Sequence, residues 1–285
     1  MKNVKVAGIR RGNQYSPNHI GSDAAIFSLT AAHLQKKGCL IDEYIESDLL
    51  VKDISARIIF NMERSKQSIG ILQRMEDEGR VVINSAYGIE NCTREKMTRL
   101  LLSHHIAHPK SLLLSTNEDP TEAIESAGFY NCWIKRGDFH AIHREDVTYV
   151  RHPEEAKGIL KEYAIRGIPT AVINEHLVGD LVKFYGVAGT DFFYWFYPSH
   201  MQHSKFGLEQ INGTAKGIPF DEVTLQKLCD EAAHVLNVRI YGGDCIVSDE
   251  GVVRLIDFND WPSFAPCRED ASPYIAACIY AQISD

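Results

Sequence analysis

The sequence lacks the features that would place this chain outside the cell or in a membrane. Its seven cysteines are odd in number and scattered, with no CxxC pair, so we expect reduced thiols packed as small apolar groups. The first residues hold no apolar run long enough for a signal peptide, and the longest apolar stretches, such as FFYWFY from Phe192, are too short to cross a bilayer. We therefore expect a cytoplasmic protein without a membrane partner.

Net positive charge is also lacking. The formal net charge is -8 at pH 7, which argues against a general nucleic-acid binder. The aromatic group at 192–197 is accordingly more typical of a core and cleft wall than of a surface that stacks bases. The charge does not exclude a nucleotide, because a few local lysines and a metal ion can hold three phosphates.

Several catalytic signatures are absent as well. The chain contains no P-loop, no HExxH and no GxSxG, and its first predicted strand is not followed by GxGxxG. His104, His105 and His108 gather late on a predicted helix without a cysteine or acid at ligand spacing. We interpret them as helix-end histidines near C-terminal carbonyls.

What is present is typical of a globular protein with two or three lobes. The chain has 285 residues, of which 45% are hydrophobic and 24% charged. Its first third alternates β-branched runs with amphipathic stretches, which predicts a small parallel sheet. The middle predicts antiparallel strands with one or two helices, and the last third an irregular stretch at 194–217 and then a helix, a hairpin and a terminal helix. The strands are expected at 4–9, 40–45, 57–62, 111–115, 129–135, 147–150, 170–174 and 181–187, and the main helices at 22–38, 65–78, 93–106, 153–163, 221–236 and 271–283.

The most informative segment is GGDCIVSDEGVVRLIDFNDWPSF, from Gly242 to Phe264. Two apolar runs flank Ser-Asp-Glu-Gly, which predicts a hairpin with a two-residue turn at Glu250-Gly251. That register places Asp244 directly across from Asp257, with Cβ atoms roughly 4.5–5.5 Å apart. Asn259 follows two residues later and points to the same face. A three-residue turn without a bulge would instead put the two acids on opposite faces.

Two carboxylates so close together repel unless a cation lies between them. Oxygen ligands of which two are charged suit Mg²⁺, with Mn²⁺ as an alternative. The other interpretation is a surface hairpin with solvated acids. Asp257, however, interrupts the run Val-Val-Arg-Leu-Ile-Asp-Phe, where an unpartnered acid is costly. The sequence therefore favours a metal site at Asp244, Asp257 and Asn259.

This hairpin resembles the last motif of the ATP-grasp superfamily, in which an Asp is followed a dozen or so residues later by Asp or Glu, one residue, Asn, and often Pro. Asp244, Asp257, Asn259 and Pro262 match that pattern. The chain is similar to ribosomal-protein glutamate ligases and glutathione synthetase-like ligases, with some features of inositol trisphosphate kinases. The resemblance implies an α/β (α+β) fold with a Rossmann-like N-terminal domain at 1–92, a leading helix and strand at 93–117, a lid at 118–175 and a C-terminal core at 176–285.

The resemblance also implies which residues meet the nucleotide. Arg94 or Lys96 would be the basic residue near the phosphates, and Lys135, at the end of an apolar strand, would reach them from the lid. Backbone groups of Asn174, Glu175, His176 and Leu177 would bind adenine, and Glu175 or Asp180 the ribose. Lys183 would point into the cleft. His140 would face a phosphate or substrate, or else be a polar loop residue, as His143 would be.

The chain departs from the family pattern at several positions. The glycine-rich lid loop is nearly absent, since Gly137 alone follows Lys135. Lys183 stands where many ligases carry an arginine. The arginine expected a dozen or so residues later is not obvious, and Lys205 or Arg239 is the candidate substitute.

Two activities remain open from the sequence. The first is an ATP- and Mg²⁺-dependent ligase that joins a small-molecule or peptide carboxylate to an amine through an acyl phosphate. The second is a kinase that phosphorylates a hydroxyl of a small polyol or sugar phosphate. In the ligase, Lys135, Arg94, Lys183 and Arg239 would be the catalytic cations. A nucleotide sensor without activity is a third alternative, and an oligomer is compatible with all three.

Overall fold

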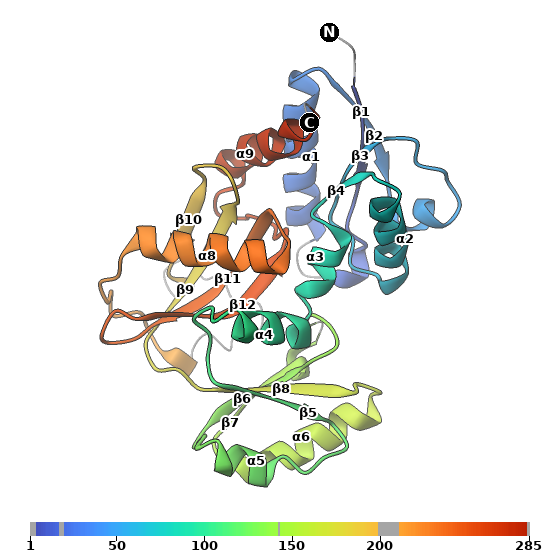
Figure 1. The fold of residues 1–285 in the computed structure, drawn as a ribbon. Helices are drawn as coiled ribbons and strands as arrows, with labels where there is room; N and C mark the ends of the chain where they lie inside the picture. The colour runs from blue at the N-terminus through green and yellow to red at the C-terminus, as the bar shows by residue number, and fades with distance from the viewer. Residues whose placement is uncertain (1–3, 17–19, 142, 199–210, 284–285) are drawn as a thin grey trace.

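A computed structural model describes residues 4–16, 20–141, 143–198 and 211–283. These residues form three four-stranded sheets, which belong to an N-terminal domain, a lid and a C-terminal core (Figure 1). No helix in these ranges is both long and apolar enough to cross a bilayer. All seven cysteines are buried and unpaired, as expected.

The N-terminal domain contains a parallel sheet in the order β2-β1-β3-β4. Alternate residues of its strands pack against α1 on one face and α2 on the other, which confirms the predicted βαβ pattern. Because the strands are parallel, the loops that follow β1 and β3 leave the sheet at the same edge. The elements are β1 (Val4–Ile9), η1 (Asn13–Tyr15), α1 (Ile20–Lys36), β2 (Cys39–Tyr44), η2 (Glu46–Leu50), β3 (Ile58–Asn61), α2 (Lys66–Asp77), β4 (Val81–Ile83) and α3 (Ala86–Asn91).

The lid is an antiparallel sheet in the order β5-β8-β6-β7, with α5 and α6 packed on its outer face (Figure 1). Strand β5 pairs with β8 and so belongs to this sheet, whereas the sequence groups it with the leading helix at 93–117. The elements are β5 (Ser111–Ser115), α5 (Thr121–Ser126), β6 (Cys132–Arg136), η3 (Arg144–Asp146), β7 (Val147–Val150), α6 (Pro153–Ile165) and β8 (Thr170–Glu175).

The core is an antiparallel sheet in the order β10-β9-β11-β12, covered on one face by α8. We expected an irregular chain from Tyr194 onward, which is wrong for its first residues: they form β10, because aromatic side chains suit an edge strand beside β9. The part of that segment with Lys205 lies outside the described residues. The elements are α4 (Arg94–Ser103), β9 (Asp180–Val187), β10 (Phe193–Phe196), α8 (Glu222–Leu236), β11 (Ile240–Val247), β12 (Val253–Asp260) and α9 (Arg268–Ala281).

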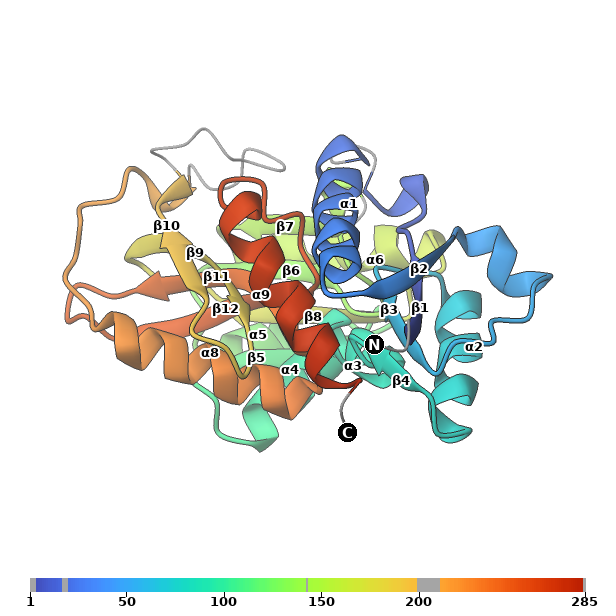
Figure 2. The ribbon, with the colours of Figure 1, turned by 90° about the horizontal axis from the view of Figure 1, so that it is seen from above.

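The C-terminal helix α9 returns to the N-terminal domain and lies beside α1 (Figure 2). Trp261, Phe264 and Ile275 share one apolar cluster with Phe27 and Phe60. The N-terminal domain and the core are therefore joined by a common hydrophobic core. This junction fixes the loops after β1 and β3 against the end of β12.

Candidate active site

A cavity of about 310 Å³ lies where the three units meet. The lid contributes Trp133 and Lys135, and the core contributes Lys183 and Asp244 among others. Two arginines of the N-terminal domain, Arg11 and Arg64, also line it. Its volume is at the lower end of the range of small-molecule sites, about 300–1,000 Å³.

A row of charged side chains crosses the core sheet inside this cavity. Lys183 on β9 is paired in register with Asp244 on β11, and Asp244 with Asp257 on β12. Nζ of Lys183 lies 3.1 and 3.2 Å from the two carboxylate oxygens of Asp244. Asn259 lines the same cavity. The alternate residues of these strands, such as Phe184, pack against α8, so the sheet separates an apolar face from a charged one.

The predicted pairing of Asp244 with Asp257 is confirmed, but the predicted turn is wrong. The N–H of Ser248 donates to the carbonyl of Val252 (2.9 Å), which leaves three residues in the turn. That turn alone would place the two acids on opposite faces. Strand β12 compensates with a bulge: Cys245 pairs with Leu255 and Asp244 with Asp257, so Ile256 is the extra residue that restores the register.

Three hydrogen bonds from outside the hairpin hold this bulge. The N–H of Leu255 donates to the carbonyl of Ala107 (2.9 Å), Nδ1 of His108 donates to the carbonyl of Leu255 (2.6 Å), and Nζ of Lys135 donates to the carbonyl of Ile256 (3.0 Å). Burial and the nearby lysine lower the pKa of His108 to about 4, so its ring is neutral. His104 does contact a carbonyl at its helix end, as expected, whereas His108 contacts the carbonyl of Leu255 at the bulge.

Two cations approach Asp257 from outside the core sheet. Arg94, the first residue of α4, places Nη2 3.2 Å from Oδ2 of Asp257, while its buried Nε has no partner among the described residues. Burial and Arg94 lower the pKa of Lys135 to about 7. Burial alone would raise the pKa of Asp257, but Arg94 and Lys135 bring it below its usual value. The carboxylate is therefore ionised, and both cations retain donors for an anion.

The donor set fits a hard divalent cation. Asp244 and Asp257 supply carboxylate oxygens and Asn259 an amide oxygen, all on one wall of the cavity. Within the described ranges no group of three or more His, Cys, Asp or Glu could hold a metal ion, so the amide is needed for a third ligand. Lys183 and Arg94 neutralise the two carboxylates in this structure and would be displaced by such an ion.

The residues expected at adenine and ribose separate into two groups. Asn174, Glu175 and Leu177 line the cavity beside Trp133. His176 stands behind this wall, where its Nδ1 accepts a hydrogen bond from Nε1 of Trp133 (3.1 Å).

Asp180 is not among the lining residues. Its carboxylate accepts three backbone N–H groups, from residues 216 to 218, at 2.7, 2.8 and 2.8 Å. Asp180 therefore anchors that loop, which leaves Glu175 as the ribose candidate that faces the cavity.

Two expected phosphate or catalytic cations lie elsewhere. Lys96 forms a surface ion pair with Glu90 (2.7 Å), because two positions along a helix turn a side chain to the far side from Arg94. Arg239 is exposed and does not line the cavity. His143 is exposed as well, whereas His140 lines the cavity with Nε2 3.4 Å from Oδ1 of Asp260.

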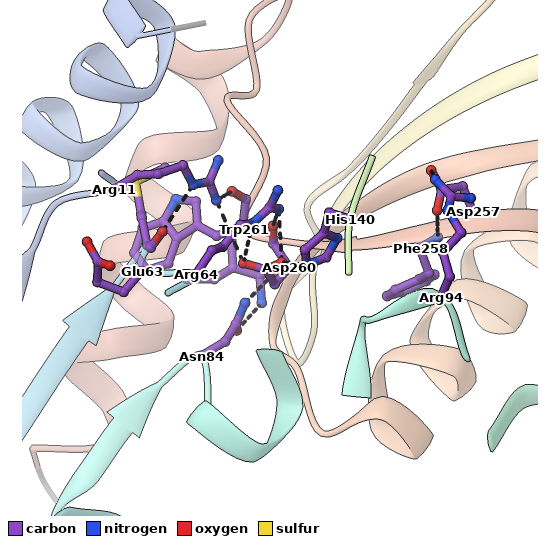
Figure 3. A network of polar contacts seen from close by, with 12 residues as sticks. Arg11, Glu63, Arg64, Asn84, Arg94, His140, Asp257, Phe258, Asp260 and Trp261 are labelled. Carbon is purple, nitrogen blue, oxygen red and sulfur yellow. Dashed lines mark hydrogen bonds and ion pairs between the residues drawn. The ribbon is translucent and has the colours of Figure 1, made fainter. Parts of the chain in front are cut away.

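Sequence reasoning missed a buried network where the N-terminal domain meets β12 (Figure 3). Arg11 donates to the carbonyls of Met62 (3.0 Å) and Trp261 (2.8 Å) and to Asp23 (3.2 Å). Arg64 forms an ion pair with Asp260, with Nη2 2.9 Å from Oδ1. The available signal was their position, because both arginines lie in the loops that follow adjacent parallel strands, within three residues of the strand ends.

No protein-family model matches the sequence, and no curated protein matches it. Solved structures do match in three dimensions. D-alanyl-alanine synthetase A from Vibrio cholerae has a TM-score of 0.71 with 11% identity, over 100% of both chains. D-alanine–D-alanine ligase from Bacillus anthracis, complexed with ATP, has a TM-score of 0.68 with 14% identity, over 98% of this chain and 96% of that one. The ATP-grasp ligase PsnB, complexed with a minimal precursor, has a TM-score of 0.62 with 14% identity, over 98% and 99%.

The chain has the ATP-grasp fold. The predicted fold class is thus confirmed over essentially the whole chain. Within this fold the cavity lies between the lid and the core, as the sequence motifs implied.

Proposed function

We propose that this protein is an ATP- and Mg²⁺-dependent ligase that joins a carboxylate to an amine through an acyl phosphate. The observation that carries the proposal is the row of Lys183, Asp244 and Asp257 across three strands, with Lys135 and Arg94 directed at the same point. The solved neighbours that share the fold along nearly their whole length are described as ligases, which favours a ligase over a kinase.

In this proposal each part of the cavity has a role that suits the residues lining it. Asp244, Asp257 and Asn259 would hold Mg²⁺, which when bound draws charge from the β- and γ-phosphate oxygens. Lys135 and Arg94 would contact the phosphates. Lys183, displaced from Asp244 by the metal ion, would contact the phosphates as well. Adenine would lie at the apolar end, against Trp133 and the backbone after β8, with Glu175 at the ribose.

The chain contributes position and electrostatics instead of a covalent nucleophile. A carboxylate oxygen of the substrate attacks the γ-phosphorus, the bond to the bridging oxygen breaks, and ADP leaves. The amine then attacks the carbonyl carbon of the acyl phosphate, expels phosphate and loses a proton. Lys135 and Arg94 offset the negative charge that develops on the transferred group, in a site from which lid closure excludes water.

The test is turnover of ATP with pooled carboxylates and amines while the phosphorus is followed. Release of free phosphate, together with an acyl hydroxamate when hydroxylamine is added, is the result expected of the ligase. A label that remains on a polyol or sugar phosphate would identify the kinase instead. Absence of ADP in every mixture would contradict both activities and leave the sensor.

A further inference from the structure

The cavity extends past the predicted phosphate site to a second charged region, where Arg11 and Arg64 line it together with Asp23. In Figure 3, Arg94 and Asp257 lie on one side of His140, and Arg11 and Arg64 on the other. Strand β12 connects the two regions, since Asp257 and Asp260 are three residues apart, or roughly 10 Å along an extended strand. That separation suits a small substrate with one end at the phosphates and its other end at the arginines.

The fold explains why two arginines meet at this point. Arg11 follows β1 and Arg64 follows β3, which are neighbouring parallel strands with aligned carboxyl ends. Ligands of open α/β sheets bind at that edge. Asp260 and the carbonyl of Trp261, at the end of β12, face the two guanidinium groups from the core.

The donors of the two guanidinium groups are used unequally. Arg11 uses all three of its nitrogens, on Met62, Asp23 and Trp261. Arg64 directs Nε and Nη2 at Asp260, but Nη1 donates to no described residue. The Arg64 side chain is 8% exposed, and the part that remains accessible lines the cavity. A buried guanidinium with a free pair of N–H donors on a cavity wall is suited to bind an anion.

A purely structural role for Arg64 would account for fewer of these observations. Contacts with Asp260 alone would join the domains without a place for Arg64 on the cavity wall. The hydroxyl-bearing residues Ser16 and Ser263 line the same cavity and add polar groups for a ligand.

We propose that Arg64, held by Asp260 and flanked by Arg11, binds a carboxylate of the substrate that does not react. Arg64 is then a specificity residue, and the substrate class is a molecule with a free carboxylate beyond the reacting groups, such as an amino acid, a dicarboxylate or a peptide with a free C-terminus. This inference rests on the proposed ligase activity.

The test pairs a change in the ligand with a change in the protein. Amino acids, dicarboxylates and dipeptides are each compared with the compound in which the non-reacting carboxyl is replaced by an amide. The comparison is made in ATP turnover, and in thermal melting of the protein with Mg²⁺ and a non-hydrolysable ATP analogue. Wild type should prefer the acid by about tenfold or more, the effect of a charge-assisted hydrogen bond. Arg64→Met and Arg64→Lys should lose that preference while KM for ATP is retained.

Arg57→Met is the matched control, because Arg57 precedes the same strand at its opposite, exposed end and should keep the preference. Equal use of acid and amide by wild type, which requires no folded variant, overturns the inference and leaves the ligase proposal intact. An acid preference in melting that depends on Arg64, without any turnover, supports the inference and counts against the ligase. No acid preference in either assay overturns the inference.

Discussion

The ion pairs of the charged row on the core sheet and those of the domain junction differ in how deeply they are buried. In the charged row, the carboxylates of Asp244 and Asp257 are 25% and 22% exposed. At the junction, the side chains of Asp23 and Asp260 are 9% and 1% exposed. The carboxylates of the first pairs are the more accessible to a ligand, whereas those of the second are almost fully buried.

The difference shows that one strand can carry both an acid that faces the cavity and an acid that is buried at the domain junction. Asp257 and Asp260 both lie on β12 and both contact an arginine from another element. Asp257 faces the cavity, so under the proposed function a metal ion and phosphate would replace its pair with Arg94. Asp260 is fully buried, so removal of its carboxylate leaves the buried guanidinium of Arg64 without its charged partner.

The largest effect is expected for Asp257→Asn, which removes the charge of the proposed metal ligand without changing the shape of the side chain. We expect Mg²⁺-dependent turnover to fall about a thousandfold while the melting temperature changes little. The control is Asp249→Asn, an exposed residue in the turn of the same hairpin that pairs with Lys216. Near-normal turnover of Asp257→Asn would refute the metal assignment.

A comparable effect, on stability instead of activity, is expected at the junction. Asp260→Ala leaves Arg64 buried without its partner, and we expect a loss of about 3–5 kcal/mol in the free energy of unfolding. Chemical denaturation measures this loss. Asp42→Ala, which removes a surface pair with Lys5, should cost less than about 1 kcal/mol. Equal losses in the two variants would show that the junction pairs do not hold the domains.

Beside the junction, Glu63 provides a pH-dependent test. Glu63 is fully buried, neither carboxylate oxygen has a partner among the described residues, and burial raises its pKa to about 7. The unfolded chain loses this proton first, so folding stability is lost as the pH rises from about 4.5 through 7.

Glu63→Gln should therefore equal wild type near pH 4 and exceed it at pH 8, by up to about 3 kcal/mol. Denaturation of both proteins across this range measures the difference, and Glu78→Gln, at an exposed glutamate, is the control. A constant difference at all pH values would mean that Glu63 is ionised in the folded protein.

The sequence predicts the fold well where the signal lies within a single element or a hairpin. The βαβ pattern and the hairpin follow from periodicity and from residue types that form turns. The pairing of Asp244 with Asp257 was predicted from a two-residue turn, but it arises from a three-residue turn and the bulge at Ile256. Lys135 and Arg94 were predicted from the resemblance to the ATP-grasp motifs, and both line the cavity. Periodicity and turn residues are local signals, so they can be interpreted without knowledge of how the elements pack.

Contacts between distant segments could not be predicted in the same way. Asp180 and Arg239 have the right charge and position in the chain, but the path of residues 216–218 and the exposure of Arg239 exclude them from the cavity. Arg64 and Asp260 are 196 residues apart and meet through the shared core of α1 and α9. The bulge at Ile256 was missed because an apolar residue in an apolar strand gives no signal of its own.

That bulge leads to the smallest predicted effect, at His108. His108→Leu removes the hydrogen bond to the carbonyl of Leu255, which should cost about 1–3 kcal/mol of stability and let Asp257 drift from its place beside Asp244. We expect the Mg²⁺ concentration for half-maximal turnover to rise by roughly three- to tenfold, the equivalent of about 1 kcal/mol. His104→Leu, at an exposed helix end, should change neither quantity. If His108→Leu loses stability but keeps its response to Mg²⁺, then Ala107 and Lys135 alone maintain the register of the two carboxylates.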